Sequence, residues 1–275
     1  MENRKPCRIV LATTGTSSWA QNLCRGGEVC VAGIIDFSNS PAQLSSLALM
    51  AHGVPIHTFT DFESLYHWIE GKGAQLLISY RVPYLIPQRL LSLFPMGGVN
   101  IHPSLLPRHR GANPWFEMYY EMDLQGGVTL HRMDAQFDHG DILAQEPFLM
   151  EPGEPLSSAR EKADGLAFKL LGRVLKNWEC SPSVPQKRDG MGKKEPMIID
   201  KSLLAWEGYR LWHLLRGFPE IIETMGLHSL PPAYRIGGYR TVPHTHKKLI
   251  GTLLQREGEI LFIVQGGAIV LEATE

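Results

Sequence analysis

The sequence has little of several features that would assign its class at once. It holds four cysteines in 275 residues, widely spaced and without a Cys-x-x-Cys pair. This favours reduced, mostly buried thiols over a disulfide framework or a structural zinc site. No apolar run approaches the ~18 residues that a membrane-spanning helix needs, and the run near the N-terminus is too short for a signal peptide. We therefore expect a soluble, cytoplasmic protein without a membrane partner.

A strong charge of either sign is also missing. The chain has 27 Lys and Arg against 28 Asp and Glu, which gives a net charge of −1 at pH 7. Proteins that bind nucleic acid usually carry a distinct basic stripe. In the C-terminal part, neighbouring basic residues form only short pairs, at residues 187–188, 193–194 and 247–248. Charge therefore gives only weak support to a tRNA partner.

Several catalytic motifs are absent as well. A dinucleotide-binding dehydrogenase would carry Gly-x-Gly-x-x-Gly after its first strand, where this chain reads Ala-Thr-Thr-Gly-Thr-Ser. There is no Gly-x-Ser-x-Gly elbow, so Ser104 is a nucleophile candidate only by its position in the chain. A metal-dependent hydrolase is the alternative from another class, but its ligands would match no compact motif such as His-Glu-x-x-His, and we predict no metal site. Those ligands would be His102, His109, His131, His139 and Asp141.

Apolar residues, in contrast, are frequent enough at 44% to build a sizeable core. They occur in short runs that alternate with segments of helical period. The runs predict strands at residues 8–12, 29–35, 56–59, 75–79, 98–102, 127–132 and 142–148. Helices are predicted at residues 17–23, 41–52, 61–70, 87–94, 114–122 and 157–177. This alternation predicts an α/β fold with a mostly parallel open sheet and helices on both faces.

The composition changes after residue 180. Residues 181–197 are rich in Ser and Pro and then in mixed charge and Gly, which is typical of a linker. Beyond them, residues 205–215 predict a helix, and residues 248–254, 259–265 and 268–272 predict strands. We therefore expect a catalytic domain over residues 1–180, a linker over 181–197 and a small C-terminal domain over 198–275.

The residues that carry chemistry lie between positions 97 and 141. Asn100 and His102 end an expected strand, and a loop punctuated by Pro and Gly follows them, while Asp138 lies in a second, acidic loop. Ligands of open parallel sheets bind beyond the carboxyl ends of the strands. An amide, an imidazole and a carboxylate can thus meet at one cleft, and these are the groups needed to transfer an acyl group to an amine.

Each group has its own task in such a reaction. Asn100 can donate a hydrogen bond to the oxyanion of the tetrahedral intermediate. His102 can polarise the carbonyl or shuttle the proton of the amine. Asp138 would orient the imidazole and raise its pKa, as an acid does in hydrolytic triads. We predict these three residues to be catalytic, and the reaction requires no covalent nucleophile.

Three segments together resemble the folate-dependent formyltransferase family. They read Asn-Ile-His-Pro-Ser-Leu-Leu-Pro-Arg-His-Arg-Gly at residues 100–111, Gly-Val-Thr-Leu-His-Arg-Met-Asp at 127–134 and Asp-His-Gly-Asp-Ile at 138–142. The resemblance covers about residues 6–180 and implies a Rossmann-like formyltransferase fold, with the family's catalytic residues at Asn100, His102 and Asp138. It also implies 10-formyltetrahydrofolate as the formyl donor. A weaker likeness of the C-terminal part implies a small β-rich, barrel-like domain.

The resemblance also implies which residues contact the folate. The family holds the pterin with the segment before the catalytic strand and with the loop that leads to the catalytic Asp. Taken alone, the apolar residues of the first segment would be core residues and the Asp of the second a turn cap. The corresponding positions are Tyr84, Leu85, Ile86, Asp134, Ala135 and Gln136.

The amine that accepts the formyl group is the least determined feature. Methionyl-tRNA enzymes of the family carry a basic insertion after the second strand, whereas residues 36–41 read Asp-Phe-Ser-Asn-Ser-Pro and no Lys or Arg occurs from 36 to 71. A loop that grips an acceptor stem should be cationic, and residues 127–133 are closer to the amino-sugar enzymes. We predict a primary or hydroxylated amine on a small molecule, foremost a nucleotide-linked amino sugar, with methionyl-tRNA as the alternative. The oligomeric state is not predicted.

Overall fold

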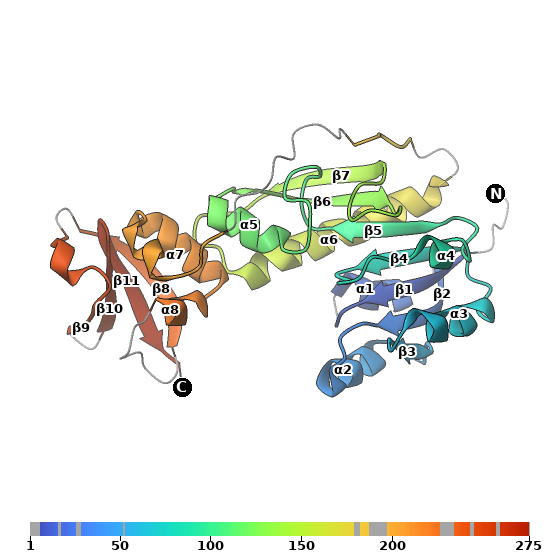
Figure 1. Cartoon of the computed structure of the whole chain (residues 1–275), viewed down its shortest axis with the longest axis horizontal. Helices are drawn as coiled ribbons and strands as arrows, with labels where there is room; N and C mark the ends of the chain where they lie inside the picture. Colours follow the sequence, from blue (N-terminus) through green and yellow to red (C-terminus); the bar gives the residue numbers. More distant parts are fainter. Residues whose placement is uncertain are drawn as a thin grey trace. The chain divides into compact units, whose positions relative to one another are not determined.

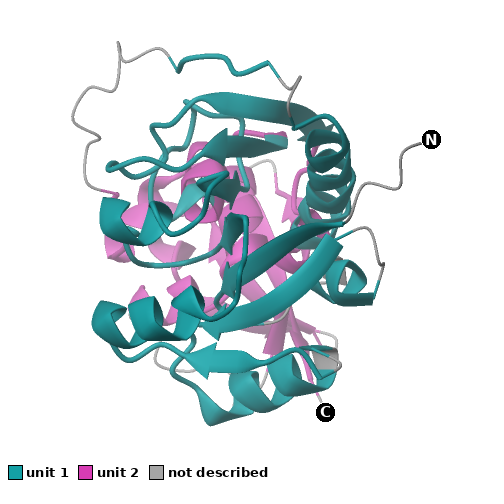
Figure 2. Ribbon diagram, turned by 90° about the vertical axis from the view of Figure 1, so that its right-hand side faces the viewer, with its two compact units in different colours: residues 1–114, 126–148, 160–188 teal, residues 115–125, 149–159, 189–275 magenta. Residues whose placement is uncertain are grey.

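The structure is a computed structural model that describes residues 6–15, 18–25, 29–51, 53–178, 182–186, 197–225, 234–242, 245–256 and 259–274. The chain forms two compact units (Figure 2). Unit 1 comprises Met1–Pro114, Gly126–Phe148 and Arg160–Arg188, and unit 2 comprises Trp115–Gln125, Leu149–Ala159 and Asp189–Glu275. The domain limits expected at residues 180 and 198 stay a prediction. The contacts also group residues 115–125 and 149–159 with the C-terminal part of the chain.

Unit 1 is built on a seven-stranded sheet with the strand order β3-β2-β1-β4-β5-β6-β7 (Figure 1). β1 pairs in parallel with β2 and β4, β2 with β3, and β4 with β5, whereas β5 and β6 are antiparallel. The prediction of a mostly parallel sheet is therefore confirmed. The strands are β1 Cys7–Thr13, β2 Val29–Asp36, β3 Ile56–Thr58, β4 Leu76–Tyr80, β5 Gly98–His102, β6 Gln125–Arg132 and β7 Ile142–Leu149.

Helices cover both faces of this sheet. All five residues of β4 are buried, and alternate side chains of a strand point to opposite faces. Leu77 packs with residues of α3 and α4, while Tyr80 donates a hydrogen bond of 2.8 Å to Asp164 of α6 on the other face. The helices in this part of the chain are α1 Ser18–Arg25, α2 Pro41–Ala51, α3 Phe62–Glu70, α4 Gln88–Leu91, α5 Pro114–Glu121 and α6 Leu156–Lys176. None of the helices in the described part of the chain is both long and apolar enough to cross a membrane.

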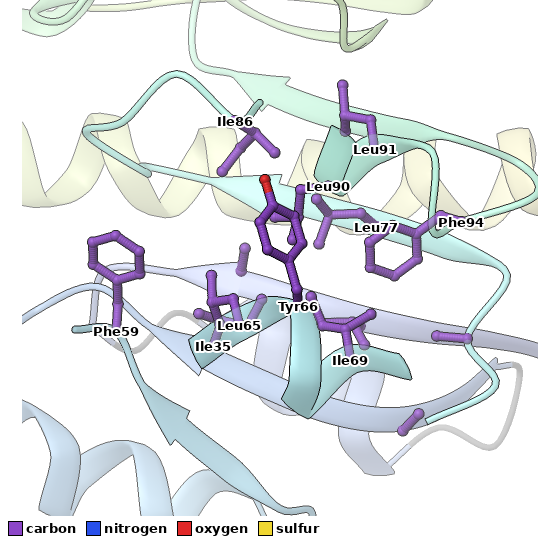
Figure 3. Close-up of a cluster of buried hydrophobic side chains, with 14 of the residues drawn as sticks. Ile35, Phe59, Leu65, Tyr66, Ile69, Leu77, Ile86, Leu90, Leu91 and Phe94 are labelled. Carbon is purple, nitrogen blue, oxygen red and sulfur yellow. The ribbon is translucent and has the colours of Figure 1, made fainter. Parts of the chain in front are cut away.

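One hydrophobic cluster fills the face of the sheet under α3 and α4 (Figure 3). α3 begins after Asp61, whose carboxylate accepts a hydrogen bond from the Ser64 N–H at 2.8 Å and so caps the helix. Leu65 and Ile69 of this helix are buried against the strands, and each such side chain contributes roughly 1.5–3 kcal/mol. The packing fixes the strands of the sheet, and loops follow at their carboxyl ends.

Unit 2 contains a separate antiparallel sheet with the strand order β8-β11-β10-β9. The sheet confirms the predicted β-rich C-terminal module. Among the described residues β8 and β9 are its two edges, so closure into a barrel is not seen in the described part of the chain. α7 packs on this sheet, and Trp212 Nε1 donates to the carbonyl of Gly237 at 2.8 Å. The elements are η2 Lys201–Ala205, α7 Gly208–Gly217, α8 Ile221–Thr224, β8 Tyr234–Thr241, η3 Lys247–Leu249, β9 Leu253–Arg256, β10 Glu259–Val264 and β11 Gly267–Ala273.

Three local features differ from the sequence predictions. β8 was not predicted, because two glycines and two arginines interrupt its apolar alternation. The strand predicted at residues 248–254 begins instead as the 3-10 helix η3, and β9 starts only at Leu253. Cys7, Cys24 and Cys30 are free and half-buried rather than fully buried, while Cys180 lies outside the described residues.

Candidate active site

The end of β5 and the neighbouring part of β6 form the floor of the site. Their antiparallel pairing places Asn100 opposite His131 and His102 opposite Thr129. Residues two apart on a strand face the same way, and so do residues that pair directly across two strands. The side chains of Asn100, His102 and His131 therefore project from the same face of the sheet.

The loop after β6 brings Asp138 to these side chains. Asn100 Nδ2 donates a hydrogen bond to Asp138 Oδ1 at 3.0 Å. Asp138 Oδ2 lies 3.6 Å from His102 Nδ1 and accepts a hydrogen bond from the Gly111 N–H at 3.2 Å. The side chain of Asp138 is 10% exposed, and His102 is buried. The structure thus brings all three predicted catalytic residues together, with the carboxylate at the centre.

The contacts of His102 determine which of its ring nitrogens can take up a proton. Nε2 lies 3.0 Å from the carbonyl oxygen of His109. Because a carbonyl oxygen can only accept, this nitrogen carries a hydrogen. Nδ1 is then the basic nitrogen, and it faces the carboxylate of Asp138. A proton taken up at Nδ1 gives an imidazolium that Asp138 stabilises directly.

His131 is a fourth polar residue of the site, which the sequence suggested only as a possible metal ligand. Its Nδ1 donates to the carbonyl of Arg132 at 2.8 Å. Its Nε2 lies 3.1 Å from Asn100 Nδ2 and 3.4 Å from Asp138 Oδ1. The neutral ring accepts a hydrogen bond from Asn100 at this nitrogen, whereas the cationic ring pairs with Asp138. His131 therefore orients the amide of Asn100.

Opposing effects set the charge state of Asp138. Burial would raise the pKa of Asp138, but the hydrogen bond with His131, the charges of His102 and His131 and the N–H of Gly111 outweigh it. Together they hold the pKa of Asp138 below its ordinary value of 3.8. The carboxylate is consequently ionised at neutral pH. It accepts hydrogen bonds from Asn100 and from the N–H of Gly111, and it faces the rings of His102 and His131.

Thr129 and Gln145 hold the loop that follows β5. Thr129 Oγ1 donates to the carbonyl of Ser104 at 2.6 Å and accepts from the N–H of Leu106 at 3.1 Å. Gln145 Nε2 donates to the carbonyl of Leu106 at 2.9 Å. Ser104 is fully buried and its hydroxyl donates to the carbonyl of Arg108 at 2.7 Å. Ser104 therefore supports the loop and is not placed as a nucleophile.

The first set of expected folate contacts divides into exposed and buried residues. Tyr84 and Leu85 are each 40% exposed. The ring of Tyr84 is held by Phe59, at 4.9 Å between ring centroids, and by Phe37, at 5.6 Å. Its exposed part is thus fixed in place and available to a planar ligand. Ile86 is 2% exposed and lies in the hydrophobic cluster (Figure 3), so only its main chain is left for a folate contact.

The second set forms a turn just before Asp138. Asp134 Oδ1 accepts a hydrogen bond from the N–H of Gln136 at 2.9 Å, which makes an Asx turn. Ala135 and Gln136 are exposed. The carboxylate of Asp134 is used within the turn, whereas the exposed positions adjoin the loop that carries Asp138. These folate contacts, like the catalytic roles, stay predictions.

The side chains considered for a metal site have other partners. His139 Nε2 lies 3.2 Å from Arg110 Nη1, and Asp141 Oδ2 accepts from the hydroxyl of Ser183 at 3.1 Å. Over the residues that the structure describes, no group of three or more His, Cys, Asp or Glu side chains is arranged to hold a metal ion.

The part of the chain that carries this site is similar to a known protein family. Residues 7–175 match the family model described as formyl transferase. The chain belongs to the formyl transferase family. The resemblance inferred from the three sequence segments is thereby confirmed.

Among relatives in the formyl transferase family, a methionyl-tRNA formyltransferase from Rickettsia massiliae (strain Mtu5) is 30% identical over 169 residues. The match covers 60% of this chain and 56% of that relative, so the chain spans about half the length of the curated relatives it matches.

Two solved structures share the fold over nearly the whole chain. WlaRD, a sugar 3N-formyl transferase crystallised in the presence of dTDP and 5-N-formyl-THF, is 17% identical with a TM-score of 0.61 over 98% of both chains. The N-formyltransferase from Helicobacter canadensis, in complex with folinic acid and dTDP-3-aminofucose, is 14% identical with a TM-score of 0.64 over 98% of this chain and 100% of that one. At these identities the likeness confirms the predicted fold.

Proposed function

We propose that this member of the formyl transferase family is an N-formyltransferase that moves the formyl group of 10-formyltetrahydrofolate onto an amine. The observation that carries the proposal is the meeting of Asn100, His102 and Asp138 at the end of β5. The family supports this class of reaction. The exposed parts of Tyr84 and Leu85 and the turn at 134–137 fit a folate, which would supply the formyl group.

The side chains divide the work of this reaction. His102 Nδ1 takes the proton that the amine loses as it attacks the formyl carbon, and Asp138 stabilises the resulting charge from 3.6 Å. Asn100 Nδ2 donates to the oxyanion, for which it must release one of its two present acceptors. It releases neutral His131 more easily, since a hydrogen bond to a carboxylate is the stronger one. His102 then returns the proton to the leaving nitrogen.

A small amine, foremost a nucleotide-linked amino sugar, is the acceptor we propose. The loop after β2 supports it, because Asp36 is fully buried and accepts from the N–H and the hydroxyl of Ser38 at 2.9 and 2.8 Å. This loop closes on itself and carries no Lys or Arg for a phosphate backbone. The neighbour from Helicobacter canadensis, which matches nearly the whole chain, holds a dTDP-linked amino sugar. Methionyl-tRNA is the second candidate, because the sequence relatives are methionyl-tRNA formyltransferases.

One assay tests the reaction and the acceptor together. Release of tetrahydrofolate from 10-formyltetrahydrofolate is followed with dTDP- and UDP-linked amino sugars, glycinamide ribonucleotide, hydroxylated amines and methionyl-tRNA, and each product is identified by mass spectrometry. We expect kcat/KM for an amino sugar to exceed that for methionyl-tRNA by at least about 100-fold. The reverse order would favour the tRNA, and no formylated product with any amine would contradict the proposed function.

A further inference from the structure

Residues 182–186, here called the strap, lie along the start of β7. Val184 and Ile142 form an antiparallel bridge in which each N–H donates to the carbonyl of the other residue at 2.9 Å. The hydroxyl of Ser183 donates to Asp141 at 3.1 Å. The sequence predicts a linker here, but these bonds hold the strap in register with β7 and place Gln186 beside the loop that carries Asp138.

Gln186 uses all its side-chain polar groups at this place. Nε2 donates to the carbonyl of Asp138 at 2.9 Å and to the carbonyl of Gly140 at 2.7 Å. Oε1 accepts a hydrogen bond from buried Arg110. Only Gln and Asn combine two amide hydrogens with a carbonyl oxygen, and Asn is one methylene shorter. The length and the chemistry of the side chain both match this position.

The loop needs to be held because of its backbone conformation. Asp138 has a φ of 55°, in the left-handed region that a residue with a Cβ rarely adopts. Such a conformation persists only where the surroundings impose it. On one side the loop lies against β6, since a Cβ on Gly140 would come within 1.9 Å of the carbonyl oxygen of Arg132. On the other side its carbonyls are held by Gln186.

We infer that Gln186 is a positioning residue, whose amide holds the main chain of Asp138 in the conformation that turns its carboxylate toward His102 and Asn100. The inference rests on the proposed catalytic role of Asp138, through which Gln186 acts. It assigns to the strap a part in the reaction that a linker would not have.

Two variants of Gln186 and one control test this assignment by steady-state kinetics. Gln186→Met removes both donors and the acceptor, while Gln186→Glu keeps an acceptor for Arg110 and turns oxygen toward both carbonyls. We expect each to lower kcat between about 10- and 100-fold, the loss typical of a misplaced catalytic group. KM for 10-formyltetrahydrofolate should stay within about twofold, because Tyr84 and Leu85 are untouched. Gln255→Met, at an exposed position of β9, should behave as the wild type.

A double-mutant cycle with Asp138→Asn separates positioning from a general structural effect. If Gln186 acts through Asp138, the double variant should be no more than about threefold slower than Asp138→Asn alone. Fully additive losses, or wild-type kcat in both Gln186 variants, would overturn the inference.

Carbon-13 NMR of the Asp138 carboxyl group gives a readout that does not depend on turnover. In Gln186→Met the titration midpoint should move upward, because a carboxylate turned away by the released main chain loses its hydrogen bonds from Asn100 and Gly111 while it stays shielded from water. An unchanged midpoint would overturn the inference. Wild-type turnover in Asp138→Asn would instead contradict the proposed catalytic role and leave the NMR result on Gln186 valid, so the two failures are distinguishable.

Discussion

The other polar groups of the site meet at the carboxylate of Asp138. It accepts from Asn100 and Gly111 and faces the basic nitrogen of His102. We therefore expect Asn100→Ala, His102→Ala and Asp138→Ala each to lower turnover by at least ~10², the usual cost of losing an oxyanion donor or a general base. Circular dichroism and thermal unfolding should show an intact fold. Turnover close to the wild-type value in any one variant would remove that residue from the mechanism.

The titration of His213 should lower the stability of unit 2 in acid. This residue is fully buried, stacks on Tyr119 at 4.7 Å and accepts at Nδ1 from the N–H of Gly153 at 2.8 Å. Burial lowers the pKa of His213 from 6.5 to about 4. Because the unfolded chain binds this proton more tightly, the contribution of His213 to stability is full above pH 6.5 and is lost as the pH falls toward about 4. The loss is on the order of 3 kcal/mol.

The substitution His213→Phe keeps the ring stack and removes the titration. Its melting temperature should fall less steeply than that of the wild type between about pH 7 and about pH 4.5. Parallel melting curves for the two proteins over this range would show that His213 does not titrate as described.

At the scale of elements, the Asp138 loop approaches β6 so closely at Gly140 that a side chain has no room there. A Cβ on Gly140 would lie 1.9 Å from the carbonyl oxygen of Arg132, and neither backbone can yield. Gly140→Ala should therefore destabilise the protein by about 1–3 kcal/mol, as overpacking does, and lower kcat at least about tenfold by displacing Asp138. Chemical denaturation and steady-state kinetics would measure the two effects.

Gly165 offers a matched control for this substitution. It lies in α6, and a Cβ added there would meet no neighbouring atom within 4 Å. Gly165→Ala should stabilise the helix by about 0.5–1 kcal/mol, because Ala is the better helix former, and leave kcat unchanged. Equal losses from both glycine variants would show that the close approach at Gly140 has no special effect.

At the scale of the whole molecule, the balanced charge predicts how rates respond to salt. The net charge is −1, and the loop after β2 has no Lys or Arg. With a small amine as acceptor, kcat/KM should change less than about threefold between about 50 and about 200 mM salt. A tRNA gripped by 6–10 phosphate contacts would lose roughly 10³–10⁵ in affinity over the same range. Stopped assays with the best acceptor at several salt concentrations would distinguish the two cases.

Local patterns were sufficient to predict the α/β fold and the three central residues. Apolar runs between helical segments mark the strands of unit 1, because a strand buried on both faces is apolar throughout. β5 was predicted with its observed limits, Gly98–His102, and polar side chains at the end of such a strand indicate a site. β8 was missed because its buried face is interrupted by glycines, so the packing of unit 2 and not the local pattern determines it.

Only the tertiary structure decided which residues support the three predicted catalytic groups. His131 lies 31 residues from Asn100 in the chain, and Gln186 lies 48 residues from Asp138. The antiparallel register of β5 and β6 places His131 opposite Asn100, and a slip of one residue would turn it to the other face. In the same way, the bridge between Val184 and Ile142 fixes the register that places Gln186 beside the Asp138 loop. Register between distant segments is set by the packing of the whole sheet, so the sequence alone suggested a metal ligand at one position and a linker at the other.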